Sequence, residues 1–345
     1  MWKRYQKLWM LVLLVLSVTG MHGCGETLPG KIELVNTIEP TSSTAIAMYE
    51  KYLYVVTEEG KLISYDVSTP NAPKKQIQVD AFKGPHLGLQ VFGSQRMILI
   101  GTDGKIALFD LSSPSNPSPV WGQGKTLKLP KVGPFIIRSS LSVMYISPGA
   151  GDAIIRVELG NIANNPNATQ ADLEKGITKI AGDGGGGIVL VRDDNQSPLR
   201  LYIGNRKTGK LDIWVVGDIE TGSAKVPASS VDIKAGTGIK SIFFFKEKSD
   251  SRRGWLILQS DSGALEYLDI GKNWVNASDP KSIATAELPN LFHMDITNKL
   301  MLTSELDIYT FTADTVNITT PEVFAKPEVR ATLNIRGLIV HKEYL

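Results

Sequence analysis

The chain has 345 residues, with 37 basic residues, 35 acidic residues and a single cysteine. Three of the basic residues and none of the acidic ones lie among the first 23 residues, so the remainder is close to neutral. A near-neutral chain argues against a nucleic-acid partner, because nucleic-acid binding needs a basic stripe. One cysteine also excludes a disulfide within a single molecule.

The N-terminus has the features of a targeting segment. Three basic residues precede the apolar run from Leu8 to Val18, which is too short to span a bilayer comfortably. Gly23 and Cys24 follow, as at the end of a bacterial lipoprotein processing site, although Met21 and His22 stand where that pattern has Leu and a small residue. We predict a signal peptide over 1–23, lipidation of Cys24 and a tether over 24–30. The alternative is an ordinary signal peptide cut near Gly20.

Lipidation would attach the protein to a membrane through its acyl chains, palmitate among them. Two or more chains hold a protein stably at a bilayer, whereas one chain binds only marginally. The residue after Cys24 is Gly25 and not Asp, which favours export to the outer membrane by the enterobacterial sorting pattern. Whether the protein faces the cell surface or the periplasm stays open.

After the tether, the chain repeats one unit. The stretch 61–73 (KLISYDVSTPNAP) recurs as 105–117 (KIALFDLSSPSNP), each following an acid-Gly hairpin signal. The apolar strand before each hairpin places six residues in equivalent positions, 44 to 57 residues apart: Leu53, Met97, Met144, Leu201, Leu256 and Leu300. A period of about 40–50 residues with several short strands is typical of a β-propeller. The longer middle spacings require loop insertions, which we expect at Asn164–Asp172 and Lys246–Arg253.

The two clear copies resemble the LVIVD-repeat family of bacterial surface propellers. In that family an apolar strand is followed by Asp, a small apolar residue, Ser and a Pro-x-x-Pro turn, as at Leu62–Pro73 and Ile106–Pro117. The other four copies match by strand pattern only. The resemblance implies a propeller at the cell surface or in the periplasm, with no catalytic residues.

We therefore predict an all-β fold, a propeller over 31–345 with about six four-stranded blades. Lys31–Ile38 is expected to be a lone outer strand, and Leu338–Leu345 parallels Ile46–Leu53, as if it began a seventh repeat. Either six blades close the ring with an end strand to spare, or a seventh blade is incomplete. Six is preferred because an innermost and an outermost strand do not pair directly.

The candidate ligand-binding rim lies where one blade connects to the next. The run Gly184, Gly185, Gly186 and Gly187 can expose backbone N–H groups to an anion or other ligand, or can simply connect blades where no side chain fits. The equivalent connections bring His86 and His293 to the same mouth of the channel. They are Phe82–His86, Lys131–Pro134, Ala235–Lys240, Pro289–His293 and Ile335–Gly337.

Other motifs favour a structural role. Gly204–Lys210 matches the start of a phosphate-binding loop, but Leu211 follows where Ser or Thr should hold the metal, so we predict a hairpin. His86, His293 and His341 come from different blades without a recognisable ligand spacing, so we expect no metal and no cofactor. No nucleophile elbow is present.

The sequence thus favours a non-enzymatic, lipid-anchored envelope protein that presents a propeller to an unknown protein or carbohydrate ligand. One alternative is a periplasm-facing scaffold for envelope assembly, although the Ala-x-Asp-x-x-Thr-Gly repeat of such propeller lipoproteins is absent. The other alternative is a propeller enzyme with a channel metal, which would need polar side chains converging in the channel.

Overall fold

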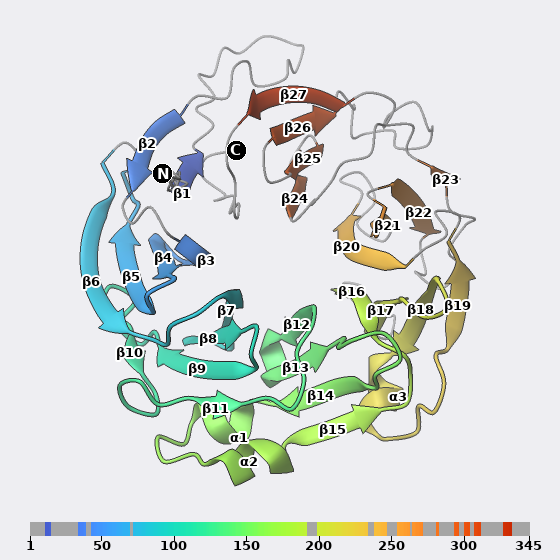
Figure 1. Ribbon diagram of the computed structural model, residues 1–345, viewed down its shortest axis with the longest axis horizontal. Coiled ribbons are helices and arrows are strands. Elements are labelled where there is room, and N and C mark those ends of the chain that lie inside the picture. Colours follow the sequence, from blue (N-terminus) through green and yellow to red (C-terminus); the bar gives the residue numbers. More distant parts are fainter. Residues whose placement is uncertain are drawn as a thin grey trace, which may run out of the picture.

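The protein is described here by a computed structural model, which covers residues 11–14, 34–38, 43–69, 72–191, 199–233, 238–246, 254–262, 264–271, 281–282, 293–296, 300–303, 307–311 and 327–332. Its described strands form six large antiparallel sheets and one two-stranded sheet, arranged in a ring (Figure 1). The prediction of an all-β propeller with about six blades is confirmed.

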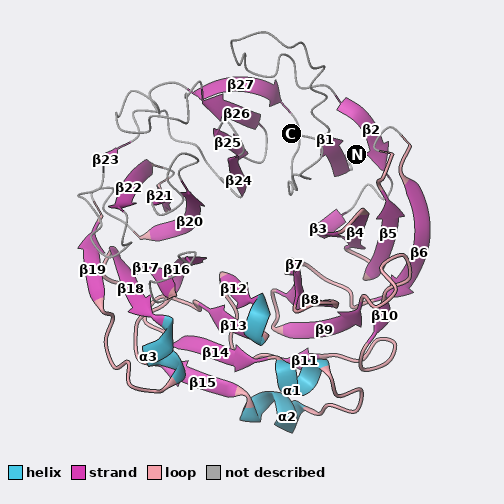
Figure 2. Ribbon diagram, turned by 180° about the vertical axis from the view of Figure 1, so that it is seen from behind, coloured by secondary structure: helices cyan, strands magenta, loops and turns pink. Residues whose placement is uncertain are grey.

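Each large sheet is a blade whose strands follow one another from the centre of the ring outwards (Figures 1 and 2). The first blade contains β3 (Ser43–Tyr49), β4 (Tyr52–Thr57), β5 (Lys61–Asp66) and β6 (Lys74–Asp80). The second contains β7 (His86–Phe92), β8 (Arg96–Gly101) and β9 (Lys105–Asp110), with the short β10 (Ser118–Pro119) and β11 (Leu127–Lys128) both paired to β9. The third contains β12 (Phe135–Arg138), β13 (Val143–Ile146), β14 (Ile154–Glu158) and β15 (Ile177–Ile180). The fourth blade contains β16 (Gly185–Val191), β17 (Arg200–Asn205), β18 (Lys210–Val215) and β19 (Ser229–Asp232). The fifth contains β20 (Ile239–Lys246), β21 (Gly254–Ser260), β22 (Leu265–Gly271) and β23 (Lys281–Ser282). The sixth contains β24 (His293–Ile296), β25 (Leu300–Thr303), β26 (Asp307–Phe311) and β27 (Pro327–Thr332).

The ring has one further position, between the sixth blade and the first. It holds β2 (Leu34–Ile38), which pairs antiparallel with β1 (Leu11–Leu14) (Figure 1). The strand expected near Lys31–Ile38 is therefore present, with a partner from the segment that the sequence assigns to the signal peptide. The signal peptide itself stays a prediction, and Leu338–Leu345 lies outside the described residues.

The repeated Asp closes the turn after the third strand of the first two blades. Asp66 Oδ1 accepts the N–H of Ser68 at 2.9 Å, and Asp66 Oδ2 lies 2.9 Å from Lys51 Nζ. In the second blade, Asp110 Oδ1 accepts the N–H of Ser112 at 2.7 Å. A carboxylate that accepts a backbone N–H two residues on mimics a turn, which explains the Asp-x-Ser of the repeat. The hydrogen bonds from Ser68 and the nearby charge of Lys51 lower the pKa of the Asp66 carboxyl to about 2.

The apolar cores lie between neighbouring blades. One cluster joins the first and second blades through buried residues such as Tyr54, Leu99 and Phe109, and another joins the third and fourth through Tyr145 and Trp214. Further clusters join the second blade to the third and the fourth to the fifth. Each of these sheets therefore buries apolar side chains against its neighbours in the ring, which is why one repeat alone could not fold.

We call the segment that follows the third strand of a blade its exit turn. Polar contacts connect each of the first three blades to the exit turn of the next blade. Tyr54 Oη donates to Pro114 O at 2.7 Å, and Ser64 Oγ donates to Ser115 O at 3.0 Å. Arg138 of the third blade pairs with Glu220, in the short helix α3 (Val216–Glu220) after β18, at 2.5 Å. We call these contacts inter-blade latches.

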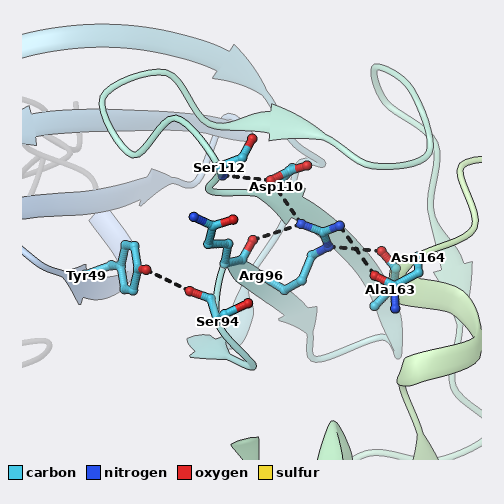
Figure 3. A network of polar contacts seen from close by, with 8 residues as sticks. Tyr49, Ser94, Arg96, Asp110, Ser112, Ala163 and Asn164 are labelled. Atoms are coloured by element: carbon cyan, nitrogen blue, oxygen red, sulfur yellow. Dashed lines mark hydrogen bonds and ion pairs between the residues drawn. The ribbon is translucent and has the colours of Figure 1, made fainter.

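The latch between the second and third blades is centred on Arg96 (Figure 3). Its Nε donates to Ala163 O at 3.0 Å, at the end of α1 (Gly160–Ala163), and its Nη1 lies 3.0 Å from Asp110 Oδ1. Trp121 Nε1 donates to Ile162 O at 2.9 Å beside it. One guanidinium therefore holds both the turn of its own blade and the exit turn of the next.

The insertion expected as a loop at Asn164–Asp172 contains part of a helix, α2 (Gln170–Lys175). Thr169 caps it by accepting the N–H of Asp172, whose side chain accepts the Thr169 N–H in return. The Gln170 amide accepts the Lys128 N–H at 2.9 Å and donates to Lys128 O at 2.8 Å, as a strand would. The insertion thus covers the edge of β11.

We expect Arg96→Met to lower the free energy of unfolding by about 1.5–3 kcal/mol, because it removes charge-assisted hydrogen bonds from half-buried acceptors. Lys175→Met is the matched control, since Lys175 is 77% exposed and its contact with Asp172 is 3.6 Å long. Urea unfolding of both variants measures the difference. Equal midpoints for the two variants would show that the latch contributes nothing.

Candidate functional site: the linker face of the ring

We call one end of the ring the linker face, because there the chain passes from the outermost strand of one blade to the innermost strand of the next. The hairpins between second and third strands lie at the same end. Ala81 N–H donates to Gly60 O at 2.8 Å and Gly84 N–H donates to Glu58 O at 3.1 Å, so the first linker lies directly on the first hairpin. Gly60 has φ +79°, and a Cβ there would lie 2.5 Å from the backbone of Phe82.

Four innermost strands carry a β-bulge at the linker face. The pairing shifts register at Thr44 in β3, Leu87 in β7, Gly186 and Gly187 in β16, and Lys240 in β20. A bulge leaves its extra residue outside the ladder and re-aims its side chain. We call these residues the bulge ring. Among them, Leu87 is 37% exposed, which is unusual for a large apolar side chain of an inner strand.

The glycine run lies at the start of β16, and the N–H groups of its first two residues are engaged within the protein. Gly184 N–H donates to Asp152 O at 2.7 Å and Gly185 N–H donates to Ser147 Oγ at 2.9 Å. A Cβ on Gly186 would lie 2.5 Å from Ile239 O, and one on Gly187 would lie 2.7 Å from Ile242 N. The absence of side chains therefore lets β16 and β20 approach backbone to backbone. A ligand cradle at these residues stays a prediction.

Ion pairs continue around the linker face from the third blade to the fifth. Lys131 pairs with Asp152, and Lys207 Nζ lies 3.5 Å from Asp183 Oδ2. Arg206, in the hairpin of the fourth blade, makes two hydrogen bonds to Asp261 in the hairpin of the fifth. These pairs are half exposed, so we assign them a positioning effect rather than a large share of stability.

His86 begins β7 at the linker face and is 9% exposed. Its Nε2 lies 3.0 Å from Phe82 O, and its Nδ1 lies 2.5 Å from the Oγ1 of Thr44. A carbonyl oxygen can only accept, so Nε2 carries a proton and, in the neutral ring, Nδ1 accepts from the Thr44 hydroxyl. Burial lowers the pKa of His86, while the Phe82 carbonyl and the charge of Asp103 act in the opposite direction.

Other predicted site residues lie partly or wholly outside the described residues. His293 begins β24, so it lies on an innermost strand as expected, but its side chain is outside the described residues. Within the described ranges, no three His, Cys, Asp or Glu side chains gather where they could hold a metal ion. Cys24 and His341 also lie outside those ranges.

The sequence that resembles a phosphate-binding loop forms a hairpin, as predicted. β17 ends at Asn205 and β18 begins at Lys210, with a turn between them. Asn205 Oδ1 accepts the N–H groups of Lys207 and Thr208 at 3.1 Å, and its Nδ2 donates to Asp212 Oδ2 at 3.0 Å. The N–H groups of Lys207 and Thr208, which a phosphate would need, are thus occupied by the protein.

The sequence did not point to Thr44. It pairs with His86 from 42 residues away, and only the strand register shows that it is the bulged residue of β3. A Thr in an apolar strand is ordinary in a β-protein. Nothing short of the three-dimensional pairing could have identified it.

Neither a protein-family model nor a curated protein sequence matches this chain. Several solved structures share its fold. The periplasmic gluconolactonase PpgL of Pseudomonas aeruginosa has a TM-score of 0.58 at 12% identity, over 94% of this chain and 95% of that one. A putative 6-phosphogluconolactonase of Bacteroides fragilis has a TM-score of 0.54 at 12% identity over the same shares. The propeller domain of Myceliophteria thermophila Cps50 (Swd1) has a TM-score of 0.56 at 11% identity, over 87% and 89%.

These comparisons correct one conclusion from the sequence. The expectation that the protein is not an enzyme is contradicted, because propellers named as lactonases share this ring over 94% of the chain, so the fold gives no ground for excluding catalysis. The expectation rested on a repeat family without catalytic residues, and a fold does not determine what its loops and strand ends do. At these identities the likeness shows the fold alone, a β-propeller.

We expect Gly187→Ala to lower the free energy of unfolding by about 1–3 kcal/mol, because the new Cβ would overlap the backbone of β20. Gly217→Ala is the matched control, since a Cβ at Gly217 meets nothing within 4 Å. Urea unfolding reports both. A Gly187→Ala protein as stable as the control would mean that β16 and β20 can separate without cost.

We also expect part of the stability to be lost as the pH falls below about 6.5, the usual pKa of His in an unfolded chain. Burial keeps the folded-state pKa of His86 lower, so below that pH the unfolded chain binds a proton that the folded chain does not. The free energy of unfolding, measured between pH 7.5 and 5, should fall less steeply for His86→Gln than for the unmodified protein. Identical slopes would contradict a neutral, buried His86.

Proposed function

We propose that this protein is a lipid-anchored envelope protein whose propeller binds a ligand at the linker face. The lone Cys24, six residues after the end of the apolar run Leu8 to Val18, is the observation that carries the anchor. Among the described residues, no helix is both long and apolar enough to cross a membrane. In this proposal, acyl chains on Cys24 supply the attachment and the ring is free to bind.

The linker face supports the proposed binding role by its shape and its charges. Linkers and hairpins from successive blades meet there, and the exposed side chains of Glu58, Glu59 and Lys83 add charge beside the first blade. Rigid strands that position loops at one end of a ring provide a preorganised binding surface. We propose a protein or carbohydrate ligand, and we propose membership of the LVIVD-repeat family on the two clear repeat copies.

A second candidate is a scaffold that faces the periplasm and assists envelope assembly. A propeller with the same ring is named a periplasmic gluconolactonase, so the fold is compatible with that compartment. The two candidates differ in exposure at the cell surface. Protease treatment of intact cells separates them: digestion of the lipidated protein supports the surface-exposed binding protein, whereas protection until the outer membrane is broken supports the periplasm-facing scaffold.

We expect Cys24→Ser to release the protein from the membrane fraction and to remove the mass of its acyl chains. Met21→Leu is the matched control, because it brings the processing site closer to the lipoprotein pattern and should keep the lipid. Intact-mass measurement of fractionated cells reports both properties. Membrane-bound Cys24→Ser protein with an unchanged mass would rule out this anchor.

A further inference from the structure

The contact between Thr44 and His86 has the geometry of a nucleophile and its base. Thr44 Oγ1 lies 2.5 Å from His86 Nδ1, within hydrogen-bonding distance. The opposite ring nitrogen, Nε2, lies 3.0 Å from Phe82 O and is held there as a donor. A third group that fixes the tautomer and orientation of the base is what activation of a hydroxyl requires.

The position of the pair makes it accessible to a ligand. Thr44 is the bulged residue of β3 and is half-buried, while His86 at the start of β7 is buried behind it. Both lie at the starts of innermost strands at the linker face. Thr44 as a residue is thus more exposed than His86, as expected for the residue that carries the nucleophile.

The competing hydrogen bond of Thr44 is weaker. The same hydroxyl lies 3.2 Å from Val56 O, across the bulge. A hydroxyl has one proton, and His86 Nδ1 is the better acceptor for it because it lies closer to Thr44 Oγ1 than Val56 O does. When His86 takes that proton, both ring nitrogens become donors. Burial lowers the pKa of His86, and the Phe82 carbonyl and the charge of Asp103 offset part of that effect on the imidazolium.

We propose that Thr44 and His86 form a nucleophile–base pair that hydrolyses carboxylic esters, including lactones, at the linker face. Thr44 Oγ1 forms a bond to the carbonyl carbon while its proton passes to His86 Nδ1. The C–O bond of the ester breaks, and the leaving oxygen takes the proton from Nδ1. The acyl group then remains on Thr44.

Water completes the cycle. It adds to the acyl carbon and gives one proton to Nδ1, after which Thr44 Oγ1 leaves and takes that proton back. One ester and one water become one acid and one alcohol, which in a lactone are parts of one molecule. No oxidant, reductant or metal is consumed. The activity goes beyond the proposed binding role and does not depend on the lipid anchor.

The test uses the full chain as the cells process it, purified in a mild detergent. p-Nitrophenyl acetate and glucono-1,5-lactone are the probes. We expect Thr44→Val and His86→Gln to lower kcat/KM by about 100-fold or more, the range typical of a lost nucleophile or general base, and Thr44→Ser to retain activity. In the unmodified protein, rapid quenching should reveal an acetyl group on the peptide that contains Thr44.

Thr102→Val is the matched control, because the Thr102 hydroxyl bonds a linker carbonyl, Pro85 O, at 3.3 Å on the same face but lies on no histidine nitrogen. It should hydrolyse both probes within about twofold of the unmodified rate. Thermal melting checks that each variant folds. If His86→Gln does not fold, the near-isosteric Thr44→Val variant alone tests the proposed nucleophile. Full activity in Thr44→Val, or no acetylated Thr44 in the unmodified protein, would overturn the proposal.

Discussion

The structure depends on the need of each sheet to bury two apolar faces, which a single repeat cannot do. Blades one to five meet this need by packing side by side, with Tyr, Trp and branched aliphatic side chains between them. Packing sheets radially brings the innermost strands together, because all of them converge on one axis (Figure 1). The crowding of innermost strands is clearest at Gly186 and Gly187, because β16 can approach the backbone of β20 only where it has no Cβ.

The inter-blade latches all run the same way along the chain, from one blade to the blade that follows it. The first, second and third blades each hold the exit turn of the following blade, through Tyr54, Arg96 and Arg138 respectively. The partners differ, being turn carbonyls in two cases and the Glu220 carboxylate in the third. What recurs is the position of the donor near the second strand and the position of the acceptor after the third. The repeat therefore conserves a geometric relationship more strictly than a residue type.

Crowding of the inner strands also creates the candidate site. A strand that must pair outward and still fit the ring at its linker end gains an extra residue there, and in β3 this residue is Thr44. His86 follows the Phe82–Pro85 linker and is buried against it. The pair thus places a hydrogen-bond donor and acceptor on two innermost strands at the linker face. Rigid placement of this kind is what chemistry on a bound carbonyl requires.

The sequence by itself determined the repeat, the hairpin between the second and third strands and the position of the Asp-x-Ser turn, because these follow from short-range patterns of apolar residues, Gly and Pro. It also placed His86 and His293 at the starts of inner strands. Only the tertiary structure decided that β1 pairs with β2, that the glycine run serves strand packing, and that Thr44 meets His86. These contacts join residues from 20 to 55 positions apart, and no local sequence pattern encodes which strands will be neighbours at these positions.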